Sequence, residues 1–350
     1  MRLRLPALAG LAFAALLLAP AAQAAHDPDW QGWFFQLDGA LVTPGNTNTA
    51  TFAQGPSALG GGILGFETDV EWVDWDDDLA LRGSIGYSFG SMGAIRVSYW
   101  TYDDTQENSG TAYDYYGANW FTVGPVTNMS LSYYYLADVA WDFEQTLETE
   151  IWDLEYTRTK QIGNPLTLTF GAGIRIASFT DTLEGRYVID PSIQNFDFAA
   201  SRSIDSDGVG ITGNIGAEYE FSDLFGISSN LRVGFLTSDS DQEHEIADVD
   251  GYVLYAGSPT YPVFSESQSF EDEVAMTYDF DINFTFHTGG YFDIELGYFY
   301  SVLTDMPTFQ LSRTWLPVSA DPLGSPPQIH GEDRENLSWG GPQLRLRLHL

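Results

Sequence analysis

Two segments of the chain concentrate carboxylates, the side chains best suited to attract cations. These carboxylates are Asp74, Asp76, Asp77 and Asp78 in the first segment and Asp239, Asp241, Glu243 and Glu245 in the second. Neither segment has the fixed spacing and the terminal Glu of a helix-loop-helix calcium site. We therefore expect solvated acidic loops that concentrate cations and repel anions, with no defined metal site.

The second segment continues to a histidine, and Asp239-Ser-Asp-Gln-Glu-His244 resembles the Asp-x-Asp-Glu-His stretch of omptin outer-membrane proteases. The resemblance implies that His244 and Asp241, facing Asp103 and Asp104 across a groove, would activate a water molecule as a general base. The sequence departs from that family, because an extra residue separates Asp241 from His244 and no Asp-x-Asp-Trp motif surrounds Asp103. Proteolysis is therefore a remote alternative, and we expect no enzyme.

No other pattern in the chain indicates catalysis. The sequence has no Gly-rich phosphate loop, no HExxH and no GxSxG. It also has no Cys, which excludes disulfides and thiolate metal sites. The sequence therefore predicts no cofactor.

The elements that must position these residues are strands. Apolar residues alternate with small or polar ones in stretches of about ten residues, which is typical of strands with one face in lipid and one in a lumen. Ten stretches show this pattern: Trp33–Thr43, Leu79–Phe89, Ala94–Asp103, Thr149–Thr159, Leu166–Ser178, Gly208–Phe221, Ile227–Thr237, Val274–Phe286, Tyr291–Val302 and Leu337–Leu350. We predict an all-β fold, a transmembrane antiparallel up-and-down β-barrel of about 10 strands, within a range of about 8 to 12.

The connections between these stretches are alternately short and long. The four short ones are Gly90–Gly93, Gln161–Pro165, Ser222–Gly226 and His287–Gly290, and the five long ones are near Pro44–Asp78, Asp104–Glu148, Thr180–Asp207, Ser238–Glu273 and Leu303–Asn336. Short periplasmic turns and long outer loops are typical of outer-membrane barrels. Gly62–Val73 and Leu131–Phe143 could add two strands or form ribbons above the membrane.

Alternation also assigns charges to the lumen face, separated by sign from strand to strand. The inward Arg residues are Arg82, Arg96, Arg175, Arg232, Arg345 and Arg347, and the inward carboxylates are Asp153, Glu155, Glu218, Glu220, Asp279, Asp281, Asp293 and Glu295. Such charges either set up a transverse field across an open pore or pair with one another and plug it. Paired charges would favour a plug, and an open constriction would favour a pore.

Two hairpins are similar to those of a known family. Asp76-Asp-Asp-Leu-Ala-Leu-Arg-Gly-Ser-Ile-Gly-Tyr-Ser-Phe89 with Ala94-Ile-Arg-Val-Ser-Tyr-Trp-Thr-Tyr-Asp103 resembles the first hairpin of Legionella-type major outer membrane proteins. Trp152-Asp-Leu-Glu-Tyr-Thr-Arg158 with Leu166-Thr-Leu-Thr-Phe-Gly-Ala-Gly-Ile-Arg175 resembles a second one. The resemblance covers about a third of the chain. It implies a pore-forming surface protein, although the Cys residues of that family have no counterpart here.

The two ends and the charge balance place the chain in the cell envelope. Met1-Arg-Leu-Arg4, the apolar run Leu5–Leu18 and Ala22-Gln-Ala24 predict a secretory signal over residues 1–24, followed by the barrel over residues 25–350. With 49 acidic and 14 basic residues, the chain is not expected to bind nucleic acid. The expected partners are outer-membrane lipid, lipopolysaccharide, the barrel-assembly machinery, cations and small solutes.

The sequence therefore predicts a porin-like protein of a Gram-negative outer membrane that passes cations and small solutes passively. The alternative is a plugged barrel with a structural or adhesive role. Aromatic girdles are expected from Trp33, Tyr99, Trp100, Tyr156 and Tyr298–Tyr300, which lie near the strand ends.

Overall fold

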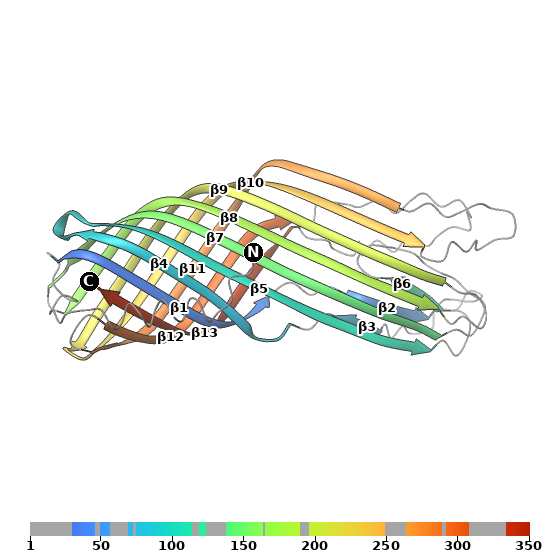
Figure 1. Cartoon of the computed structure of the whole chain (residues 1–350), viewed down its shortest axis with the longest axis horizontal. Helices are drawn as coiled ribbons and strands as arrows, with labels where there is room; N and C mark the ends of the chain where they lie inside the picture. Colours follow the sequence, from blue (N-terminus) through green and yellow to red (C-terminus); the bar gives the residue numbers. More distant parts are fainter. Residues whose placement is uncertain are drawn as a thin grey trace, which may run out of the picture.

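The computed structural model is a closed ten-stranded antiparallel barrel (Figure 1), which confirms the predicted fold class. It describes residues 30–45, 50–56, 69–72, 75–113, 119–123, 138–163, 165–189, 196–248, 264–288, 292–307 and 334–350. The predicted signal segment lies outside these residues. Among the described residues, no helix is long and apolar enough to cross a bilayer.

Each barrel strand pairs with its neighbours along the chain, and the last strand returns to the first. The strands are β1 (Gln31–Gly45), β4 (Asp78–Phe89), β5 (Ala94–Tyr113), β7 (Asp138–Gln161), β8 (Leu166–Ile189), β9 (Phe196–Ser222), β10 (Phe225–Asp248), β11 (Phe264–His287), β12 (Phe292–Pro307) and β13 (Arg334–His349). Each of the ten predicted stretches falls on one of these strands, except that Tyr291 lies outside the described residues and Leu350 follows β13. A single-turn 3-10 helix, Gly90–Met92, joins β4 to β5, and Gly90 and Gly93 there have the positive φ angles that glycine tolerates best.

The predicted long loops are partly wrong, because six strands continue well past the lipid-facing band. Strand β5 has 20 residues, β7, β8, β10 and β11 each have 24, and β9 has 27, whereas a strand needs about 10 residues to cross a membrane. In Figure 1, β5 and β7–β10 project to the right, beyond β1 and β4. We call this part the outer extension: residues 101–113, 138–150, 178–189, 196–207, 238–248 and 264–273. The stretch Thr180–Asp207 is therefore mostly strand, and only residues 190–195 connect β8 to β9.

The two additional predicted segments do not enlarge the barrel. Gly62–Val73 contains β3 (Asp69–Trp72), which pairs with β2 (Ala50–Pro56) in a separate small sheet that also contains β6 (Asn119–Val123). The described part of Leu131–Phe143 is the beginning of β7. The strand count therefore stays at ten.

The outward face of the membrane-spanning part is apolar. On β10, for example, Phe225, Leu231 and Phe235 are exposed, as lipid contact requires. Trp33, Tyr99, Tyr156, Tyr298 and Tyr300 also face outward, as expected for interfacial aromatic side chains. Trp100 and Phe299 do not, because they occupy inward positions of their strands and are buried in the barrel.

Candidate functional site

The barrel interior holds the main concentration of charge, and all ten strands contribute to it. Each charge predicted for the lumen face lies on the inner side of its strand, either buried or half-buried. Asp38 on β1 is a further inward carboxylate. Around the barrel, β4, β5, β8, β10 and β13 carry inward Arg, and β1, β7, β9, β11 and β12 carry inward carboxylates, so that most neighbouring strands carry opposite charges.

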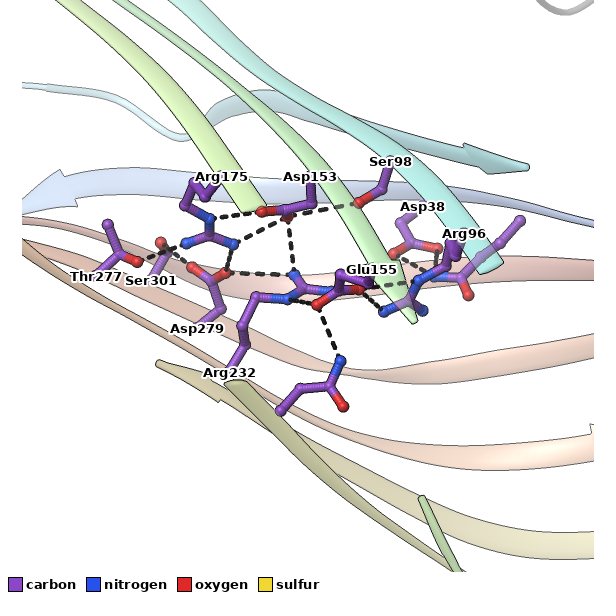
Figure 2. Close-up of polar contacts among 12 residues, drawn as sticks. Asp38, Arg96, Ser98, Asp153, Glu155, Arg175, Arg232, Thr277, Asp279 and Ser301 are labelled. Carbon is purple, nitrogen blue, oxygen red and sulfur yellow. Dashed lines mark hydrogen bonds and ion pairs between the residues drawn. The ribbon is translucent and has the colours of Figure 1, made fainter. Parts of the chain in front are cut away.

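The first cluster of contacts surrounds Arg175 on β8 (Figure 2). Its guanidinium donates from Nε to Asp153 Oδ1 at 2.7 Å and from Nη2 to Asp279 Oδ2 at 2.6 Å. Asp279 belongs to β11, and β9 and β10 separate that strand from β8, so this ion pair joins strands that are not neighbours. The hydroxyl groups of Thr277 and Ser301 complete the cluster with bonds of 2.7 Å each.

The second cluster surrounds Glu155 on β7. Arg232 of β10 donates to both oxygens of this carboxylate, at 2.7 and 2.9 Å, and Arg96 of β5 donates to Oε2 at 2.5 Å. Asn214 of β9 adds a bond of 2.9 Å. A side chain at Gly173 on β8 would collide with the Glu155 backbone and side chain, so glycine there makes room for the cluster.

The third cluster closes the junction between the first and last strands. Arg345 of β13 contacts Asp38 at 3.0 Å, Asp281 at 3.2 Å and Glu295 at 3.1 Å. Arg347 contacts the other oxygen of Glu295 at 2.5 Å. The three clusters together form what we call the charge layer, which consists of Asp38, Arg96, Asp153, Glu155, Arg175, Arg232, Asp279, Asp281, Glu295, Arg345 and Arg347.

The remaining predicted lumen charges lie beside this layer. The Arg82 guanidinium carbon is 4.8 Å from the centre of the Phe299 ring, a cation–π distance. Asp293 contacts His287 at 3.1 Å and His349 at 3.5 Å near the turns. Glu218 and Glu220 line the cavity described below.

An apolar layer lies inside the barrel on the long-loop side of the charge layer. Along a strand, the apolar layer begins one or two inward positions beyond the charge layer. On β7, Ile151 is the inward position next to Asp153, and on β8, Ala177 and Phe179 are the two inward positions that follow Arg175. Its members are all at most 6% exposed: Ala40, Val42, Ala80, Trp100, Tyr102, Leu147, Ile151, Ala177, Phe179, Leu236, Ala275, Phe299, Leu303, Leu337 and Trp339. Trp100 and Trp339 meet edge to face at 5.3 Å. These side chains pack together away from water, as apolar surface does.

A cavity of about 320 Å³ lies on the opposite side of the charge layer. Its walls reach the turn end at Gly90 and Gln161, and Arg82, Arg232 and Arg345 line its inner end. This cavity therefore extends from the short turns to the charge layer.

Comparison with known proteins adds information about the fold. No protein-family model matches the chain, and no curated protein matches it. The outer membrane protease OmpT from Escherichia coli is similar over 91% of this chain and 97% of its own, with a TM-score of 0.50 and 10% identity. The fold is that of an outer-membrane β-barrel. Two channel structures are more distant. The toluene transporter TbuX from Ralstonia pickettii has a TM-score of 0.27 and 8% identity, over 93% of this chain and 92% of its own. A mutant of the TodX monoaromatic hydrocarbon channel has a TM-score of 0.29 and 8% identity, over 96% of this chain and 94% of its own.

Of the residues predicted for a proteolytic group, Asp103 and Asp241 point away from the barrel interior and Asp104 points toward it, and the proteolytic alternative stays a prediction. Asp241 lies on the outward face of β10, where the Ser269 hydroxyl donates to it at 2.6 Å, and Asp103 lies on the outward face of β5. Two residues that both point away from the interior do not face each other across it. The His244 side chain lies outside the described residues, although its backbone belongs to β10.

The predicted acidic loops are in part acidic strands. Asp239, Asp241, Glu243 and Glu245 occupy alternate outward positions of β10, and all four are exposed. Asp78 begins β4, the Thr43 hydroxyl donates to the exposed Asp77, and Asp76 is exposed beside it. Asp74 lies outside the described residues. Exposed carboxylates also pair in register across strands, as in the row Glu107, Glu144 and Glu184.

Proposed function

We propose that this outer-membrane barrel is closed, and that it supports and displays the acidic outer extension at the cell surface instead of conducting solutes. The observation that carries the proposal is the crossing of the lumen by ion pairs between strands that are not neighbours. Arg175 on β8 reaches Asp279 on β11, and Arg232 on β10 reaches Glu155 on β7.

The burial of these groups supports the same interpretation. The side chains of Arg175 and Arg232 are 1% and 3% exposed, and that of Glu155 is fully enclosed. Charges that line a water-filled pore stay hydrated, whereas charges removed from water require close partners of opposite sign. The apolar layer adds a second closure, and a barrel of this size has an interior that side chains nearly fill.

A cation-preferring pore is the second candidate. The polar cavity that opens at the turn end and the acidic outer face both favour it, since negative mouths concentrate cations. The resemblance of two hairpins to Legionella-type major outer membrane proteins also favours this candidate, and it stays a prediction.

Planar-bilayer recording distinguishes the two functions. The chain from residue 25 onward is refolded into lipid, and its folded state is verified by heat-modifiable mobility in a gel. We expect no discrete current steps in a salt gradient, while an open porin inserted in the same bilayers gives steps. Regular steps with a cation-selective reversal potential would overturn the closed-barrel proposal and establish the pore.

A further inference from the structure

Two cationic side chains lie together on the outer surface at the turn end of the barrel. Arg158 and Lys160 occupy the last two outward positions of β7, and both are exposed. Lys160 is the only lysine in the sequence. In the part of the chain that the structure describes, no hydrogen bond or ion pair holds either side chain, whereas most other Arg residues are paired inside the barrel.

The strand arrangement leaves this pair accessible from the side. Pairing between β5 and β7 ends at Thr157, opposite Ala94, and β7 continues to Gln161 with only β8 beside it. The 3-10 turn Gly90–Met92 lies next to this free edge, where the Tyr156 hydroxyl donates to the Met92 carbonyl. Arg158 and Lys160 therefore lie on an unpaired strand end between the β4–β5 turn and the β7–β8 turn.

The neighbours of the pair are apolar and point toward the membrane. Phe170, the cross-strand partner of Arg158, is 47% exposed, and Ile162 and Met92 at the two turns are 49% and 67% exposed. Exposed apolar side chains next to cations suit a membrane interface, where acyl chains cover the first and phosphates bind the second. Since the short turns of such barrels face the periplasm, the interface concerned is that of the periplasmic leaflet.

We propose that Arg158 and Lys160 bind the phosphate of an anionic phospholipid in the periplasmic leaflet, with its acyl chains against Phe170. A phospholipid with a net negative headgroup fits better than a zwitterionic one, because the choline group of the latter would bring a third positive charge to the site. Lipopolysaccharide occupies the opposite leaflet and does not reach this end. Free phosphate would lack the apolar contacts.

Native mass spectrometry of the refolded chain in mixed micelles tests the site by titrating in phosphatidylglycerol or phosphatidylcholine. We expect tighter retention of phosphatidylglycerol, and about fivefold weaker binding in each of the variants Arg158→Gln and Lys160→Gln. The double variant should lose at least tenfold. The control Arg186→Gln removes an exposed outward Arg of the outer extension and should bind like the unmodified chain.

The proposed site would be overturned by equal affinities for the two lipids, or by a double variant that still retains phosphatidylglycerol. It would also be overturned if Arg186→Gln lost as much lipid affinity as the site variants, or if inorganic phosphate displaced the lipid at a concentration similar to that of the lipid. If the double variant fails the gel-mobility test of folding, the two single variants decide the question.

Discussion

The charge layer inside the barrel and the outward face of the outer extension are both rich in charge, but their charges are arranged in opposite ways. Inside, Arg and carboxylate groups come from different strands and contact one another, as Arg232 and Glu155 do at 2.7 Å. Outside, carboxylates stand opposite carboxylates, as Asp103 does with Glu148 and Asp205 with Asp241. Burial explains the difference, because an unpaired charge is costly away from water, whereas water and salt screen exposed like charges.

Strand β7 runs through both regions and allows the same chemical change to be compared in each. The largest effect should come from Glu155→Gln, which leaves Arg232 and Arg96 without their shared carboxylate. We expect a loss of about 3 kcal/mol in the free energy of unfolding. Urea titration of the barrel in lipid vesicles, followed by tryptophan fluorescence, measures it, and a loss below about 1 kcal/mol would show that the layer is hydrated.

An intermediate effect should come from the pair Arg175 and Asp279. The single variants Arg175→Met and Asp279→Leu each remove one side of this contact, although Asp279 still has Arg232 and Arg175 still has Asp153. The double variant removes both charges. A double-mutant cycle in the same urea assay should give a coupling of about 2 kcal/mol. Additive losses would mean that the two side chains act independently and that their contact does not hold β8 to β11.

The smallest effect should be a gain, in Glu144→Gln on the outer extension. Glu144 stands between Glu107 and Glu184, so removing its charge relieves two cross-strand repulsions. We expect an increase of about 0.5 kcal/mol at low salt that disappears at high salt. Melting temperatures at two salt concentrations measure it, and a decrease would indicate that these carboxylates have a stabilising role, such as a shared bound cation.

Much of the membrane-spanning part could be predicted from the sequence. Its strands face lipid on one side and a charged interior on the other, so apolar and polar residues alternate along them with a period of two. That contrast assigned the inward face of Arg175 and of Glu155. Asp38 carries the same signal, since it shares one face of its strand with Gln36 and Ala40, but it was not among the predicted lumen charges. Trp100 was placed in a girdle although it alternates with the outward Tyr99.

Part of the outer extension could not be predicted, because both faces of some of its strands are polar. On β10, the inward Ser238 and Ser240 alternate with the outward Asp239 and Asp241, so the hydrophobic contrast disappears while the strand continues. The sequence also could not predict which charged residues form ion pairs inside the lumen. Arg175 and Asp279 are 104 positions apart, and which residues meet across a barrel depends on the stagger of its strands.

The contact between Asp38 and Arg345 has a consequence for assembly. These residues stand directly opposite each other at the seam between β1 and β13, the last pairing that the chain can complete. If the seam closed one residue out of step, Arg345 would turn toward lipid, at a cost of about 2–4 kcal/mol near the bilayer centre. A misaligned closure would thus reopen more readily than the aligned one. The Asp38–Arg345 pair therefore favours the correct register of β1 against β13 when the barrel closes.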